Sequence, residues 1–128
     1  MRILIADDSE LVRRALRDLL SKEAGHEVCG EAGDGSEAIE RVRELRPDLV
    51  LLDIWMPSGN GFETSRQLRD QFPALKILIM SQEDAVRLLP SARRAGADGC
   101  LDKSQLGADL FDAIRNLGNA RACGSAGN

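Results

Sequence analysis

Three carboxylates stand at the ends of two apolar runs in this sequence. Asp7 and Asp8 follow the run Arg2–Ala6, and Asp53 ends a longer run that begins after Pro47. Such runs, bounded by turn residues, are typical of strands that are covered on both faces of a parallel sheet. The carboxyl ends of parallel strands meet at one edge, where ligands bind, so these acids are candidates for chemistry. A helix cap or a solvated turn residue is the alternative interpretation.

A hydroxyl and an ammonium group occupy comparable positions later in the chain. Ser81 follows the apolar run Leu75–Met80, and Lys103 follows a short run that begins at Gly99. Three crowded carboxylates raise one another's pKa unless a cation neutralises them, and a small open site with oxygen ligands favours Mg²⁺ over Ca²⁺. An acidic nucleophile, a metal, a hydroxyl and an ammonium together predict phosphoryl transfer to a carboxylate.

The elements that must position these groups alternate between strand and helix. A helix is expected after each strand, and the strands are expected over residues 2–6, 27–32, 47–53, 75–80 and within 96–103. This alternation predicts an α/β fold with a doubly wound, five-stranded parallel sheet of order 2-1-3-4-5, a flavodoxin-like (βα)5 arrangement. That order places the first and third strands side by side, with the switch point between them.

The beginnings of several helices can be placed from their first residues. Candidate caps are Asp8 or Ser9, Asp34 with Glu37, and Asn60 with Glu63. The fourth helix is less regular, because Pro90 would remove a backbone donor from its interior and crowd the preceding turn. We therefore expect a loop or a kinked first turn over Gln82–Leu89 and a regular helix only from about Pro90.

Composition excludes several kinds of function for this stretch of chain. The net charge of −4 supplies no basic face for phosphate backbones, so we expect no nucleic-acid binding by this domain itself. No apolar run approaches the ~20 residues that span a bilayer, and no signal pattern opens the chain, which predicts a cytoplasmic protein without membrane contact. Cys29, Cys100 and Cys123 form neither a disulfide pattern nor a zinc pattern, and the first two are expected to be buried thiols. His26 is expected on the surface without a partner.

The length of 128 residues suits one domain with its own core. The helical spacing of apolar residues ends at Leu117, after which the chain becomes rich in Gly, Ala and Asn. We therefore expect a domain over residues 1–118 and a disordered tail or truncated linker over residues 119–128.

The ordered polar positions carry a family resemblance. Asp7-Asp8, Asp53 followed by Ile54-Trp55-Met56-Pro57 and Gly61, Ser81, and Gly99–Lys103 resemble the CheY-like receiver domain of two-component response regulators, in order and in spacing. The resemblance runs from about residue 2 to about residue 118. Several ordered positions make it far more specific than one short motif.

The resemblance implies a role for each of these positions. Asp53 would accept a phosphoryl group from the phosphohistidine of a sensor histidine kinase. Asp8, Asp53 and the backbone carbonyl of Trp55 would hold Mg²⁺, and Asp7 would act largely through a metal-bound water. Ser81 and Lys103 would bind the phosphoryl oxygens, and Ser81 would move toward the new phosphate as the switching step. Such a domain catalyses only its own phosphorylation and dephosphorylation and is not otherwise an enzyme.

Two positions depart from the family pattern. Family members usually carry Tyr or Phe where this chain has Cys100, and proline where it has Ser104. Without the aromatic ring, coupling from Ser81 to the surface of the fourth and fifth helices must run through backbone movement. A small buried thiol is favoured over a redox role for Cys100, because nothing near it in the sequence lowers its pKa.

The resemblance also bears on output and partners. Glu31–Gly35 and Gly96–Gly99 look like the segments of regulators that carry a LuxR-type helix-turn-helix output, so control of transcription through an output domain outside this chain is expected. A homodimer formed on phosphorylation could pair arginines with acids of the last helix, although such charges more often form a solvated face. The charges concerned are Arg13, Arg14 and Arg17, or Arg87, Arg93 and Arg94, with Asp109 and Asp112.

Other functions compete with this interpretation. An Asp-nucleophile phosphohydrolase would place a second acid two residues after the nucleophile, where this chain has Trp55. A flavodoxin-like flavin carrier needs a phosphate-cradling loop and stacking aromatics, and only 3% of the residues are aromatic. A stand-alone receiver that controls a partner protein stays open, whereas an unphosphorylated scaffold is disfavoured because no member of the polar set is missing.

Overall fold

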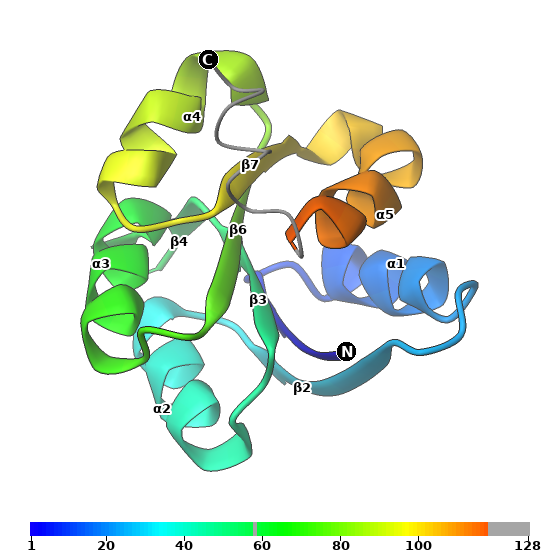
Figure 1. Ribbon diagram of the computed structural model, residues 1–128, viewed down its shortest axis with the longest axis horizontal. Coiled ribbons are helices and arrows are strands. Elements are labelled where there is room, and N and C mark those ends of the chain that lie inside the picture. The colour runs from blue at the N-terminus through cyan, green and yellow to red at the C-terminus, as the bar shows by residue number, and fades with distance from the viewer. Residues whose placement is uncertain (58, 118–128) are drawn as a thin grey trace.

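A parallel sheet of five strands runs through the part of the chain described by this computed structural model, residues 1–57 and 59–117 (Figure 1). The strand order is β2-β1-β3-β6-β7, which confirms the predicted order and fold class. The strands are β1 (Arg2–Ala6), β2 (Glu27–Ala32), β3 (Leu49–Asp53), β6 (Lys76–Ser81) and β7 (Gly99–Asp102).

Helices cover both faces of the sheet. Helices α1 (Glu10–Leu20) and α5 (Leu106–Leu117) lie on one face, and the other face carries α2 (Gly35–Leu45), α3 (Gly61–Gln71) and α4 (Ala85–Arg94) (Figure 1). Successive side chains of a strand point to opposite faces, so each strand contributes to two cores.

The first strand shows this division between the two cores. Ile3 and Ile5 pack in the cluster under α1 and α5, whereas Leu4 and Ala6 pack in the cluster under the other three helices. A strand that is buried on both faces needs an apolar residue at every position. This requirement explains the continuous apolar runs of the sequence.

The central strand β3 is buried along its whole length. It pairs in parallel with β1 on one side and with β6 on the other, and every residue from Leu49 to Asp53 is buried. Its last residue, Asp53, is therefore held by a strand that has neighbours on both sides. The sheet supplies a rigid mount for a carboxylate at its carboxyl edge.

A small antiparallel ribbon follows β3, which the sequence interpretation did not include. It consists of β4 (Trp55–Met56) and β5 (Gly59–Asn60). Gly61 then passes so close to the end of β3 that a Cβ atom there would lie 2.6 Å from the carbonyl oxygen of Asp53. A larger residue at this position would push the loop away from Asp53.

The predicted caps are confirmed in three helices. Ser9 Oγ accepts from the Val12 N–H at 3.3 Å at the start of α1. Asp34 Oδ1 accepts from the Glu37 N–H at 2.8 Å, and Asn60 Oδ1 accepts from the Glu63 N–H at 3.0 Å. These bonds satisfy N–H groups that have no partner inside a helix.

The prediction for the fourth helix is wrong. Helix α4 begins at Ala85, after Asp84 accepts from the Val86 N–H at 2.9 Å, and Pro90 lies inside it. Only residues 82–84 of the expected irregular segment stay outside the helix. The proline deprives the Val86 carbonyl of its helical donor. Val86 is 79% exposed, so water can replace that donor, while Ala92 on the inner side packs in the core.

The remaining expectations have mixed outcomes. His26 does have partners, because its Nε2 lies 2.9 Å from Oε1 of Glu23 and its ring stacks on Phe111. Among the described residues, no helix is long and apolar enough to cross a membrane. Residues 119–128, with Cys123, lie outside the described residues, so the predicted domain boundary stays a prediction.

Candidate functional site

The carboxyl edge of the sheet brings three acids together. Carboxylate oxygens of Asp7, Asp8 and Asp53 all lie within 4.8 Å of one another. Asp7 and Asp53 are buried, whereas Asp8 is exposed. Asp7 follows β1 and Asp53 ends β3, and these two strands are neighbours in the sheet. The crossover of the chain at this point therefore creates the cluster.

Lys103 joins this cluster from the other side of β6. Its Nζ lies 2.7 Å from Oδ2 of Asp7 and 3.0 Å from Oδ1 of Asp53, and its side chain is only 13% exposed. The lysine opens a short 3₁₀ helix, η1 (Lys103–Gln105), directly after β7. Asp102 forms this turn, because its Oδ1 accepts from the N–H and the hydroxyl of Ser104 at 2.8 and 2.7 Å. The turn thereby aims the lysine across the sheet edge.

The charges of the site do not balance. Burial raises the pKa of Asp53, and the negative charge of Asp7 adds to this effect, while the hydrogen bond from Lys103 opposes it. Burial lowers the pKa of Lys103, but the hydrogen bonds and charges of Asp7 and Asp53 outweigh burial, so the pKa of Lys103 is raised. One ammonium therefore faces three carboxylates, and an additional cation would relieve the excess negative charge.

Backbone donors fix the orientation of the buried acids. The Ser9 N–H donates to Oδ1 of Asp7 at 2.9 Å, and the Trp55 N–H donates to Oδ1 of Asp53 at 3.4 Å. These donors belong to the loops that follow β1 and β3. Each loop therefore holds the carboxylate that its own strand delivers.

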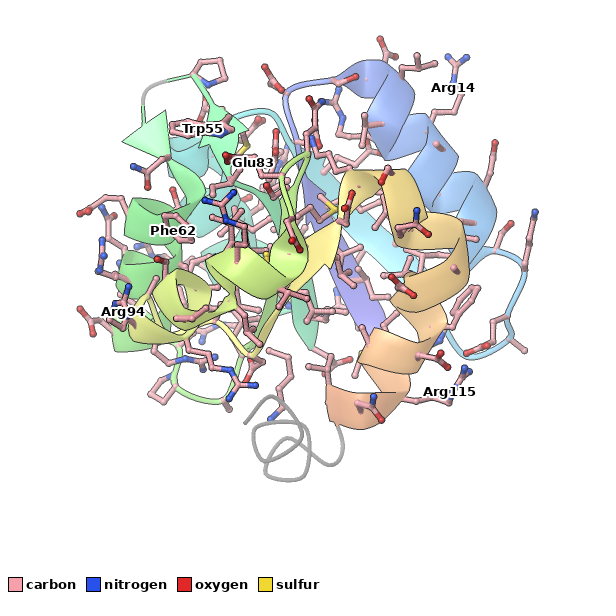
Figure 2. All side chains as sticks on the ribbon, turned by 90° about the horizontal axis from the view of Figure 1, so that it is seen from above. Arg14, Trp55, Phe62, Glu83, Arg94 and Arg115 are labelled. Carbon is pink, nitrogen blue, oxygen red and sulfur yellow. The ribbon has the colours of Figure 1, made fainter. Side chains whose placement is uncertain are left out.

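Ser81 and Trp55 complete the edge in different ways. Ser81 ends β6, is fully buried, and its Oγ accepts from the Glu83 N–H at 2.9 Å. Trp55 is 63% exposed, and Figure 2 shows its side chain at the same end of the sheet as Glu83. The structure therefore places the serine in the interior and the tryptophan at the rim.

A cleft of about 240 Å³ opens over the acids. The sequence interpretation missed Ser9 as a backbone donor and Gln82 as a lining residue. Both directly follow a singled-out residue, Asp8 and Ser81, and this adjacency was the available signal. The cleft is lined by Asp7, Asp8, Ser9, Val12, Asp53, Trp55, Gln82 and Lys103.

The donor set of the cleft fits a hard divalent cation. Three carboxylates within 4.8 Å of one another supply the oxygen ligands that such ions prefer. The exposure of Asp8 leaves one side of the cluster open to water and to a substrate. Asp7, Asp8 and Asp53 are thus the residues that could hold a metal ion.

Cys100 is a half-buried apolar thiol rather than the fully buried one that was expected. Its side chain packs against the core cluster under α4, and burial raises its pKa to about 11, with the charge of Asp102 adding to the effect. A thiol with a raised pKa is rarely ionised and reacts slowly. A backbone hydrogen bond at Leu101 lowers the pKa of this thiol, but burial outweighs it, so the net shift is upward. Cys29 is also partly buried, and burial raises its pKa.

The fold and this arrangement of acids and lysine define a signalling domain of a known kind. The family described as "Response regulator receiver domain" matches residues 3–115, and the chain belongs to this family. The resemblance seen in the sequence is thereby confirmed. The domain is a receiver of two-component signalling, and its relatives include transcription regulators.

Relatives of two kinds are similar to the chain. The DNA-binding transcriptional activator DevR/DosR of Mycobacterium tuberculosis is 38% identical over 95% of this chain, which spans 56% of that protein. The chemotaxis protein CheY of Thermotoga maritima is 41% identical over 91% of this chain and 96% of its own length. The chain therefore spans about half the length of some curated relatives and nearly all of another.

Solved structures agree with this assignment. A two-component response regulator of the LuxR family from an Aurantimonas species superposes with a TM-score of 0.85 at 35% identity, over 91% of this chain and 83% of that chain. The receiver domain of the putative response regulator NarL from Mycobacterium tuberculosis has a TM-score of 0.82 at 30% identity, over 94% of this chain and 95% of that chain.

Proposed function

We propose that the chain accepts a phosphoryl group on Asp53 from the phosphohistidine of a sensor histidine kinase, in a Mg²⁺-dependent reaction. The observation that carries this proposal is the Lys103 ammonium, which lies within 3.0 Å of both Asp7 and Asp53 in a buried cluster of acids. A lysine in this position suits a phosphoryl oxygen on the neighbouring carboxylate.

The transfer makes one bond and breaks one. An Asp53 carboxylate oxygen attacks phosphorus, the phosphorus–nitrogen bond of the phosphohistidine breaks, and the electron pair stays on the imidazole. A bound Mg²⁺ would supply charge neutralisation for the incoming phosphoryl oxygens. Asp7, Asp8 and Asp53 would hold it, together with the backbone carbonyl of Trp55.

Lys103 has a second role once the phosphoryl group is in place. Its ammonium can move from the Asp53 carboxylate to a phosphoryl oxygen while its bond to Asp7 persists. Ser81 is buried beside the site, and its Oγ accepts from the Glu83 N–H at 2.9 Å. Movement of the hydroxyl toward the phosphate would break that bond and shift the loop before α4. This shift is the switching step that we propose.

The output of the switch is control of transcription. The curated relative DevR/DosR is a DNA-binding transcriptional activator, and this chain matches about half of it. We infer that the chain works as the receiver part of such a regulator in the cytoplasm, with DNA contact made by another domain. The stand-alone alternative is favoured by the CheY relative, which the chain spans almost completely.

The ion pairs within the chain limit which charged residues are available for the homodimer that we expect on phosphorylation. Arg13 and Arg17 bind Glu31 of their own chain, and Asp112 binds Arg115 at 2.5 Å, so these groups already have partners. The exposed Arg87 and Asp109 remain for contacts between copies. Arg14 of α1 is exposed as well, so a dimer that pairs Asp109 with either Arg87 or Arg14 fits these charges.

The proposed acceptor can be tested with acetyl phosphate and Mg²⁺. The protein should gain one acid-stable, base-labile phosphoryl group, measured by intact mass, and Asp53→Asn should gain none. Asp18→Asn, which changes an exposed acid on α1, is the matched control and should be labelled like the wild type. Equal labelling of Asp53→Asn would overturn the assignment. Hydrolysis of a stable phosphate monoester over many turnovers, which self-phosphorylation from acetyl phosphate does not require, would instead favour the phosphohydrolase.

A further inference from the structure

Arg13 connects helix α1 to the backbone of the acid cluster. A terminal guanidinium nitrogen donates to the carbonyl oxygen of Asp7 at 2.5 Å, and Nε donates to Oε1 of Glu31 at 2.8 Å. The N–H of Asp7 donates to the carbonyl of Ala32 at 3.0 Å, so both backbone polar groups of Asp7 are held. The Arg13 side chain is only 20% exposed, which limits competition from water.

Glu31 reaches Arg13 because β2 carries a bulge. Ile3 of β1 pairs with Val28, but the next residue, Leu4, pairs with Gly30, and the intervening Cys29 has no partner in this register. One residue of register decides which face of the sheet a side chain occupies.

The bulge decides the face on which Glu31 lies. Without the extra residue, Glu31 would be opposite Ala6, whose side chain packs on the α2 side. With it, Glu31 is opposite Ile5, whose side chain packs under α1 and α5. The irregular strand therefore turns this carboxylate toward Arg13.

We propose that Arg13, held by Glu31, is a positioning residue for the acid cluster. The Asp7 carbonyl and the Asp8 N–H belong to one planar peptide group. An arginine that fixes this oxygen therefore fixes the plane that joins the two acids, and with it the direction of their side chains toward Asp53. This inference rests on the proposed function, in which the cluster binds Mg²⁺ and Asp53 accepts the phosphoryl group.

Neighbouring arginines provide matched controls. Arg17 contacts the other carboxylate oxygen of Glu31 but has no described contact with Asp7. Arg14 is exposed on the same helix and points away from the sheet (Figure 2). Removal of either side chain changes the charge of α1 by the same amount as removal of Arg13, without touching the cluster.

Mg²⁺ titration followed by tryptophan fluorescence tests the role directly. Trp55 is the only tryptophan and lines the cleft, so its emission reports on the site. Arg13→Ala should weaken Mg²⁺ binding about tenfold, as supporting partners of metal ligands typically do, and should slow labelling by acetyl phosphate. Arg17→Ala and Arg14→Ala should bind Mg²⁺ like the wild type.

Arg13→Lys is a second variant that separates a positioning role from a loss of folding in Arg13→Ala. Lysine keeps the charge but cannot reproduce the fixed fork that serves Glu31 and Asp7 together, so an intermediate Mg²⁺ affinity is expected. Equal affinity in the wild type, Arg13→Ala and Arg17→Ala would overturn the inference, as would a wild type that binds no Mg²⁺. The wild type could bind Mg²⁺ but take no phosphoryl group from acetyl phosphate. The proposed function would then fail, while the Mg²⁺ affinities of the variants would still test the positioning role of Arg13.

Discussion

The two edges of the sheet carry cavities of very different character. At the amino edge, a hollow of about 640 Å³ lies between the C-terminal ends of α2 and α3. Phe72, Leu75 and Pro73 line much of it, and the Arg46 guanidinium lies 5.3 Å from the centre of the Phe72 ring. The cleft at the carboxyl edge, about 240 Å³, is much smaller but holds the acids and Lys103.

This difference teaches that size does not identify the functional edge. Apolar residues around an open hollow need no further explanation, because folded proteins expose much apolar surface. Buried carboxylates cost free energy unless they are paired, and here one lysine must serve two of them. Apolar residues at these buried positions would cost the fold less free energy than the acids do. The presence of the acids therefore indicates function.

The largest expected effect comes from removing the cation of the carboxyl edge. Lys103→Met leaves Asp7 and Asp53 buried without their ion pair, which should lower the free energy of unfolding by about 3 kcal/mol in EDTA. Lys76→Met, at the amino edge, should change it by no more than about 0.5 kcal/mol. Urea unfolding at pH 7 measures both, and Mg²⁺ should restore part of the loss in Lys103→Met. Equal losses of unfolding free energy in Lys103→Met and Lys76→Met would contradict the difference between the two edges.

An intermediate effect is expected at the amino edge. Phe72→Ala removes half-buried packing and the contact with Arg46, so unfolding should become easier by about 2 kcal/mol. Mg²⁺ affinity and labelling by acetyl phosphate should stay at the wild-type level, because the hollow lies at the opposite edge from the acids. Trp55→Ala is the matched aromatic deletion at the other edge, with a stability change within about 0.5 kcal/mol because its ring is largely exposed. Weaker Mg²⁺ binding in Phe72→Ala would contradict the separation of the two edges.

The smallest effect concerns the pH dependence of stability. The folded protein raises the pKa of Asp53, mainly through burial, above the ordinary value of the unfolded chain. Between these two values the folded form keeps a proton that the unfolded form has lost, so stability falls as pH rises through that window. Asp53→Asn removes this decline and should be more stable than the wild type at pH 7 in EDTA, by about 1 kcal/mol. Thermal unfolding of both proteins from pH 4 to pH 7 is the measurement, and an unchanged difference across that range would count against a raised pKa.

Much of the fold and site was predictable from local signals. Apolar runs without alternation predicted strands that are buried on both faces, and caps such as Ser9, Asp34 and Asn60 marked where helices begin. The acids and Lys103 could be assigned to one edge because parallel strands deliver their carboxyl ends to the same side. These features depend only on residue type and short spacing, which the printed sequence contains.

Other features depended on contacts between distant segments. Pro90 lies inside α4 because the neighbouring Val86 is exposed to water and the inner side of the helix is held by the core. The partners of His26 come partly from α5, far along the chain. Local propensity could not decide either case, because packing against the rest of the molecule outweighed it.

Sequence alone determined which groups could do chemistry and at which edge of the sheet they gather. Only the tertiary structure decided how they are held: Lys103 bridges Asp7 and Asp53, and Arg13 binds Glu31 and the Asp7 carbonyl together. For Arg13 and Glu31, the physical reason is the register of β2. Its bulge at Cys29 turns Glu31 to the α1 side, and only the pairing of β1 with β2 reveals such a shift.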